Sequence, residues 1–232
     1  MSEGLLVLLI GAMILCINLA WSLLRGGELG RRYPLVELPG PLALGWGTAI
    51  IGAAALYVGV WLTPSAGSLW EPAIGSGLAT SGVAIFSLGW MSVLVDSRSR
   101  LLPTQLTWMM LAEVAAAWLI YNVYSGFTSA AFVAPLLGAG IWLLPILVGE
   151  ATKNVGRGDL KLAPVLGLAV GTSSVTLAVV GLVFAFVTAA IQSGYVLSRS
   201  REPGRKIPMG PHLITGAWVA WTAGAVGPML FA

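Results

Sequence analysis

The sequence predicts an all-α integral membrane protein, in which residues 1–232 form a single domain, a polytopic bundle of about eight transmembrane helices. Two observations predict this class. Of the 232 residues, 57% are hydrophobic and only 9% are charged, whereas roughly 25% of the residues in a soluble globular domain carry a charge. The apolar residues also gather in runs close to the roughly 20 residues that span the hydrocarbon core of a bilayer.

Eight apolar runs follow one another with short polar connections. They lie at about 5–24, 41–63, 75–95, 105–123, 129–148, 161–173, 175–197 and 211–231. The first run is preceded by Glu3 and by no basic residue, unlike a signal peptide, so we expect a retained helix. It contains the only cysteine, Cys16, which we expect to pack as a small apolar residue. The sixth run is the shortest, so its helix must begin near Gly158 or stop short of the far interface.

The basic residues predict the orientation of the bundle. All twelve lysines and arginines fall in four connections. They are Arg25, Arg31 and Arg32; Arg98 and Arg100; Lys153, Arg157 and Lys161; and Arg199, Arg201, Arg205 and Lys206. An even number of crossings separates these connections, so they share one face, and the positive-inside rule assigns that face to the cytoplasm. The N and C termini are then both extracytoplasmic. Topology accounts for the net charge of +3, so we expect the lipid bilayer, and no nucleic acid, as a partner.

The sequence has only two aspartates, and both are expected at the basic face. Asp96 ends the third run and Asp159 precedes the sixth, and two complete crossings return the chain to the same side. Two carboxylates that share a site hold one proton between them near neutral pH. The ionised carboxylate can then activate a water that attacks a carbonyl, while the protonated one hydrogen-bonds the carbonyl oxygen. We therefore predict one paired catalytic site; the alternative is that each aspartate only caps a helix or lies in a solvated loop.

The residues near the aspartates suit a substrate in an extended conformation. Gly156 and Gly158 lack side chains, so a substrate backbone could come close. Lys161 could pair with a carboxylate or extend to the lipid headgroups. Pro103 fits a turn or the first turn of the fourth helix.

Glu113 and His212 are two other polar residues that could have a functional role. Glu113 falls near the middle of the fourth run, roughly 25 Å along the helix axis from Asp96. A carboxylate inside a membrane is a functional candidate by default, but at this distance we expect a protonated, hydrogen-bonded packing residue. His212 begins the last run, and one histidine with one cysteine offers too few ligands for a metal. We expect neither a metal nor another cofactor, and a packing or hydrogen-bonding role for His212.

Three segments resemble motifs of the type IV prepilin peptidases, which are membrane aspartic proteases of the GxGD class. VDSRSRLLPTQLT (95–107) resembles their first aspartate motif, and GRGDLKLAPVLGLAVG (156–171) resembles their GxGDxKL motif. IPMGPHLITGA (207–217) resembles their Pro-Phe-Gly-Pro segment, with Met209 and His212 where aromatic residues are usual. The three motifs occur in the expected order on an eight-span frame.

The resemblance implies a peptidase of the bacterial cytoplasmic membrane whose active site faces the cytoplasm. Its substrates would be prepilins or pseudopilins, each with a basic leader and a hydrophobic helix. Asp96 and Asp159 would be the catalytic pair. The supporting motif residues would be Gly156, Gly158, Lys161, Pro103, Pro208, Gly210 and Pro211. Glu150 and Glu202 could attract the leader.

The chain departs from the family in its first cytoplasmic connection. Many bacterial members have a larger loop there, with paired CxxC motifs that bind zinc, and they also methylate the new N terminus. Here the segment RGGELGRRYPLVELPG (25–40) has 16 residues and no cysteine. This excludes such a zinc module and argues against N-methyltransferase activity.

Two other functional classes stay open. A small transporter or channel could also use membrane carboxylates, but the sequence has no sign of an internal repeat, and both aspartates are expected at one face and not at the midplane. An inactive scaffold of the pilus or secretion machinery would bind a substrate without cleaving it.

Overall fold

The computed structural model describes residues 3–32, 40–59, 72–99, 101–124, 126–200 and 207–230, and within these ranges it contains eight α-helices and no strand. The helices are α1 (Glu3–Arg32), α2 (Pro41–Tyr57), α3 (Pro72–Ser99), α4 (Thr104–Tyr124), α5 (Ser129–Ala151), α6 (Arg157–Gly171), α7 (Val175–Ser200) and α8 (Gly210–Leu230). The predicted all-α bundle of eight helices is confirmed. Arg100, Arg201, Glu202, Arg205 and Lys206 lie outside the described residues.

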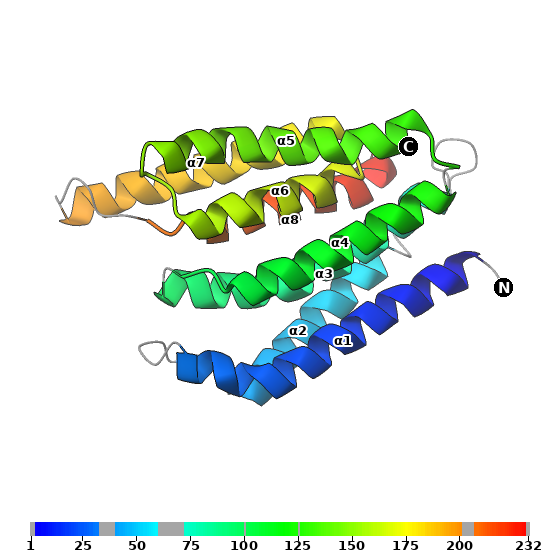
Figure 1. The fold of residues 1–232 in the computed structure, drawn as a ribbon, viewed down its shortest axis with the longest axis horizontal. Helices are drawn as coiled ribbons and strands as arrows, with labels where there is room; N and C mark the ends of the chain where they lie inside the picture. Colours follow the sequence, from blue (N-terminus) through cyan, green and yellow to red (C-terminus); the bar gives the residue numbers. More distant parts are fainter. Residues whose placement is uncertain are drawn as a thin grey trace.

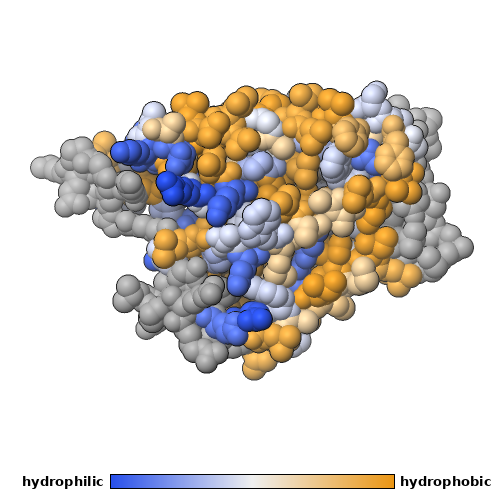
Figure 2. Space-filling model, in the orientation of Figure 1, coloured by the Kyte–Doolittle hydropathy of each residue, from blue (hydrophilic) through white to orange (hydrophobic). Residues whose placement is uncertain are grey.

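Five of these helices are long and apolar enough to cross a membrane. In the described ranges, the qualifying segments are Leu8–Arg25, Thr80–Ser99, Thr104–Val123, Ser129–Ala151 and Val175–Arg199. The apolar part of α2 is shorter, Leu42–Tyr57. On the face seen in Figure 2, hydrophobic side chains cover most of the helix flanks, and hydrophilic ones gather at the left end. This distribution suits a bundle whose sides contact lipid.

The helices run side by side, and the chain reverses direction from each to the next (Figure 1). The C-terminal ends of α1, α3, α5 and α7 lie at the same end of the bundle as the starts of α2, α4, α6 and α8. The start of α1 and the end of α8 lie at the opposite end. The four predicted basic connections therefore adjoin one end of the bundle, as the counting of crossings requires. Which end faces the cytoplasm stays a prediction of the positive-inside rule.

Some helix boundaries differ from the apolar runs. α3 continues to Ser99, so Asp96 lies in a helical turn near its end and does not open a loop. The serine hydroxyls there bond back to the helix, from Ser97 to the Leu94 carbonyl at 3.2 Å and from Ser99 to the Val95 carbonyl at 2.7 Å. The helix thus continues into the polar segment that follows the apolar run. α1 likewise continues past Leu24 to Arg32.

Two helix pairs approach closely through glycine. A Cβ on Gly138 of α5 would lie 2.3 Å from the Gly167 carbonyl oxygen of α6. A Cβ on Gly216 of α8 would lie 2.3 Å from the Gly181 carbonyl oxygen of α7. Neither position admits a side chain, so these glycines set the spacing of α5 against α6 and of α7 against α8.

Two tryptophans connect more distant helices. The Nε1–H of buried Trp142 in α5 donates to the Ala178 carbonyl of α7 at 2.8 Å. The Nε1–H of Trp218 in α8 donates to the Ile85 carbonyl of α3 at 2.9 Å. Together with the glycine contacts, these bonds hold α3, α6 and α8 in one packed unit, and the ends of those three helices meet at the site described next.

Candidate active site

Asp96 and Asp159 lie at neighbouring helix ends and are both buried. Asp96 is in the last turns of α3 and Asp159 is in the first turn of α6. Their exposed fractions are 4% and 8%. An aspartate is seldom this buried unless it is paired or functional. Here two buried aspartates lie at the same end of the bundle.

The two carboxyl groups both lie beside Gly210, the first residue of α8. A Cβ placed on Gly210 would lie 2.5 Å from Oδ2 of Asp96 and 3.4 Å from Oδ1 of Asp159. The two oxygens are therefore at most about 6 Å apart, the combined length of those two distances, which is within the range where neighbouring charges interact strongly. A negative charge on Asp96 therefore repels a negative charge on Asp159. The structure brings together the two aspartates that the sequence predicts as a pair.

Backbone amides at two helix starts lie beside these carboxyl groups. The amide of Gly210 is next to the Asp96 carboxyl, and the amide of Gly156 is next to the Asp159 carboxyl. The first N–H groups of a helix have no partner inside the helix, so they are available to stabilise negative charge. Oδ2 of Asp96 is buried and has no hydrogen-bond partner of normal geometry among the described residues.

This arrangement disfavours two negative charges at once. Burial removes water from both carboxyl groups, and their mutual repulsion adds to that cost, so a state with one shared proton is favoured. The pair can then act as one acid and one base on the same reacting group.

The two glycines of the second motif have different surroundings. A Cβ on Gly156 would lie 3.4 Å from Oδ2 of Asp159, and Gly156 is exposed, so the approach to this carboxyl is open. A Cβ on Gly158 would lie 2.9 Å from Cβ of Leu102. The prediction that Gly158 leaves room for a substrate is therefore not what the packing shows, because Leu102 fills that space.

Lys161 is not part of the pair of aspartates. It is exposed and lies two residues after Asp159 in α6, which turns its side chain roughly 200° around the helix. Within the described part of the chain it forms no ion pair, whereas Arg157 lies 3.5 Å from Glu150. The described residues thus give Lys161 no carboxylate partner, and its contact with the lipid headgroups stays a prediction.

The three prolines of the motifs lie at helix starts. Pro103 is buried immediately before α4, and its carbonyl accepts the Thr107 amide at 3.3 Å. Pro208 precedes α8, and Pro211 is the second residue of that helix. Proline suits these positions because its missing N–H would have no helical partner. The prolines thus fix where α4 and α8 begin, next to the carboxyl groups.

Other polar residues form links between helices. The ring of His212 in α8 contacts α7 through Nδ1, 3.1 Å from the Thr188 hydroxyl, and through Nε2, which meets Oε1 of Gln192. The Nδ2 amide of Asn18 in α1 donates to Glu113 at 3.0 Å and to the Ser87 hydroxyl at 2.8 Å. His212 and Glu113 thus each hydrogen-bond to another helix, as the sequence predicts.

Cys16 corrects one expectation, because it is exposed and not packed. α1 turns Ile14 and Asn18 toward the bundle, and a residue midway between them points roughly 200° away from each. Among the described residues, no group of three or more His, Cys, Asp or Glu side chains could hold a metal ion.

Sequence reasoning did not find two features of the site. The first is that Gly210 lies beside both carboxyl groups, and the second is the packing of Leu102 on Gly158. The Gly-Pro pair at 210–211 is a signal for a helix start, but it does not reveal which carboxyl groups that start touches.

Fold and site together define a helical membrane protein with a buried pair of aspartates at one end of its bundle. Residues 82–194 match the model of the type IV leader peptidase family. The matched segment contains both aspartates.

Two relatives extend the similarity over most of the chain. A protein of Xanthomonas campestris pv. campestris named prepilin leader peptidase/N-methyltransferase is 28% identical over 87% of this chain and 64% of its own length. A protein of Pseudomonas aeruginosa with the same name is 30% identical over 83% of this chain and 58% of its own. The chain thus spans about three fifths of the length of these relatives. No solved structure is significantly similar to it. Its apolar helices and bacterial relatives indicate a protein of a bacterial inner membrane.

Proposed function

We propose that this protein is an aspartic endopeptidase that removes the leader from type IV prepilin-like proteins. The observation that carries the proposal is the buried pair formed by Asp96 and Asp159, whose oxygens beside Gly210 lie at most about 6 Å apart. The family match over 82–194 and the names of the two relatives supply the substrate class.

The chemistry needs one water and one shared proton. The ionised carboxylate takes a proton from the water as the water oxygen attacks the carbonyl carbon of the scissile peptide bond. The protonated carboxyl donates its proton to the carbonyl oxygen, which gives a neutral tetrahedral intermediate. In the breakdown of this intermediate the C–N bond breaks, the protonated carboxyl donates its proton to the leaving amine, and the other carboxylate takes the proton of one hydroxyl as the C=O bond re-forms. The pair ends with one proton, as it began.

The residues around the pair support this sequence of steps. The unpartnered Oδ2 of Asp96 is available to a water or to the substrate carbonyl. The Gly210 amide lies beside the Asp96 carboxyl, and the open approach beside Gly156 gives an extended substrate backbone access to Asp159. Gly210 also leaves the space next to both carboxyl groups free of a side chain.

The substrate would reach the site from the cytoplasm. The pair lies at the end of the bundle that adjoins the basic connections, which the positive-inside rule assigns to the cytoplasmic side. A basic leader would lie there, with the hydrophobic helix of the substrate alongside the bundle. Glu150 contributes little attraction to the leader, because Arg157 already lies 3.5 Å from it.

We assign the peptidase activity alone. The relatives are named for two activities, and this chain spans about three fifths of their length. The first connection lacks cysteines, so we expect no methylation of the product.

The test is cleavage of a purified prepilin by the purified protein in detergent or vesicles, with the cleaved bond located by mass spectrometry. Asp96→Asn and Asp159→Asn should each abolish cleavage while the protein still inserts and folds. Glu113→Gln is the matched control, since it alters a carboxyl group bonded to Asn18 and remote from the pair, and it should cleave normally. Substrate that co-purifies without being cleaved by the wild type would indicate a scaffold instead.

A further inference from the structure

A groove on the flank of the bundle exposes one side of α6 between α4 and α5. Its lining comes from Trp108 and Leu111 of α4, Ala139 of α5, and Lys161, Pro164 and Leu168 of α6, among others. Its volume is about 360 Å³. The groove is separate from the aspartates, because its α6 residues lie on the side of that helix opposite Asp159.

The polarity of the groove changes along its length. Lys161 lies at the end nearest the start of α6, and the lining from Pro164 to Leu168 is apolar. Lys161 and Leu168 are seven residues apart in the helix, roughly 10 Å along its axis. A phospholipid has the same order of groups, with a charged head at the membrane surface and a hydrocarbon chain below it.

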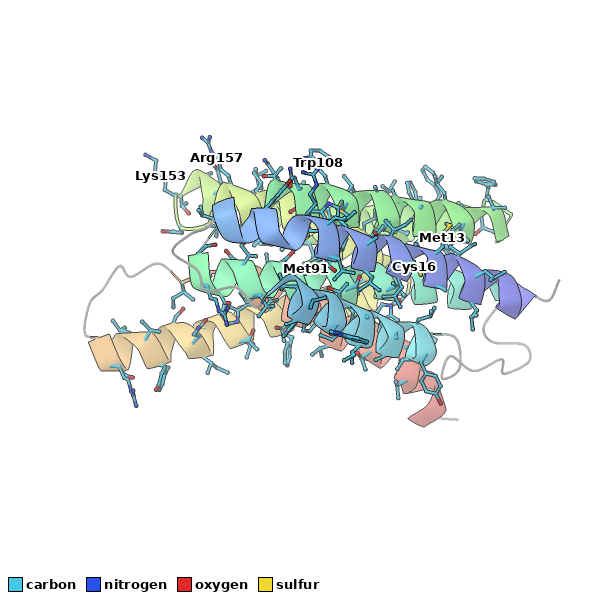
Figure 3. The ribbon with its side chains drawn as sticks, turned by 90° about the horizontal axis from the view of Figure 1, so that it is seen from below. Met13, Cys16, Met91, Trp108, Lys153 and Arg157 are labelled. Carbon is cyan, nitrogen blue, oxygen red and sulfur yellow. The ribbon has the colours of Figure 1, made fainter. Side chains whose placement is uncertain are left out.

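The charges near the head end are mostly positive. Lys153, Arg157 and Lys161 are exposed there, and Glu150 is the acidic residue beside them. Figure 3 shows Lys153, Arg157 and Trp108 projecting from the same flank of the molecule. Trp108 is 60% exposed at the rim of the groove, and tryptophan is favoured at the level of the headgroups.

We propose that this groove binds one acyl chain of an anionic phospholipid, whose phosphate is held by Lys161. The lipid would join α4 to α6 on the side of α6 that faces away from Asp159. This site rests on the groove and its charge, and it does not depend on the peptidase function.

Trp108 provides a direct readout of occupancy. The protein is reconstituted in phosphatidylcholine bilayers that contain a minor fraction of phosphatidylglycerol with brominated acyl chains, which quench tryptophan on contact. The contribution of Trp108 is the fluorescence lost in Trp108→Phe. We expect this component to be quenched at lower fractions of brominated phosphatidylglycerol than of brominated phosphatidylcholine.

Two variants and two controls connect the quenching to the groove. Lys161→Gln should raise the phosphatidylglycerol fraction needed for half-maximal quenching about fivefold, the effect of removing one basic residue from an anionic lipid surface. Ala139→Phe should abolish the selective quenching by filling the groove. Arg199→Gln, a basic residue of α7, and Leu136→Phe, an exposed residue of α5 outside the groove lining, should leave it unchanged.

Three outcomes would overturn the proposal. They are equal quenching by the two brominated lipids, selective quenching that survives both Lys161→Gln and Ala139→Phe, and removal of the quenching by a stoichiometric hydrophobic peptide, which would make the groove a peptide site. Asp96→Asn should quench as the wild type does, so loss of peptidase activity and loss of lipid binding are measured separately.

Discussion

Gly210→Ala should disable the site without unfolding the protein. The added Cβ would lie 2.5 Å from Oδ2 of Asp96, whereas ordinary contacts of a Cβ begin at 3.4 Å. The Asp96 carboxyl must therefore retreat by about 1 Å, and a misplacement of that size can reduce a catalysed rate about 100-fold. The fold should persist, because the only severe contact is with the end of a side chain.

The assay is kcat/KM for cleavage of a prepilin, measured together with the thermal unfolding of the same preparation. Gly194→Ala in α7 is the matched control, since no heavy atom lies within 4 Å of its added Cβ. It should keep wild-type kcat/KM and raise the free energy of unfolding by up to about 1 kcal/mol, the difference in helix propensity between alanine and glycine. Gly210→Ala with wild-type kcat/KM would refute the placement of Gly210 beside the carboxyl groups.

Three further changes follow from the packing. Gly138→Ala should lower the unfolding free energy by about 1–3 kcal/mol, because its Cβ would overlap the Gly167 carbonyl oxygen and force α5 from α6; an unchanged melting temperature would contradict that contact. Glu113→Leu should lower the free energy of unfolding by up to about 1.7 kcal/mol, because it removes the hydrogen bond from Asn18, and Glu113→Gln should lower it less. Equal melting temperatures of the two variants and the wild type would mean that this hydrogen bond does not stabilise the fold. Cys16→Leu should leave the melting temperature unchanged, because the side chain is exposed on the bundle, and a clear fall in the melting temperature would mean that Cys16 is packed.

The eight helices could be predicted because the signal is local. An apolar run of the length of a bilayer specifies a helix wherever it occurs, since backbone polar groups in lipid must be bonded within the helix. The ends were less predictable, as α3 shows by continuing through Asp96 to Ser99. The helix continues through polar residues beyond the apolar run, and hydrophobicity alone does not register that continuation.

The meeting of Asp96 and Asp159 could be predicted at the level of the bundle face, because two crossings return the chain to its starting side. Their separation within that face could not. It depends on the packing around Gly210, which belongs to a third helix and lies beside both carboxyl groups. Which helix start packs between two others is decided by tertiary packing, here by glycine contacts and tryptophan hydrogen bonds far from the site.

The expectation for Cys16 was wrong because it treated the first apolar run as uniform. Asn18 and Ser22 lie one turn apart in that run, and polar side chains in a membrane helix usually face the bundle. In the structure the face of α1 toward the bundle carries Ile14, Asn18 and Ser22, and Cys16 lies on the other side.

The most direct test of the central claim is a double-mutant cycle on the two aspartates, with prepilin cleavage as the measured rate. Residues that act as one unit are not additive, so Asp96→Asn and Asp159→Asn should each remove the catalysed cleavage, and the double variant should be no slower than either single variant. Cleavage by either single variant at the wild-type rate, or losses that multiply in the double variant, would contradict a shared catalytic site.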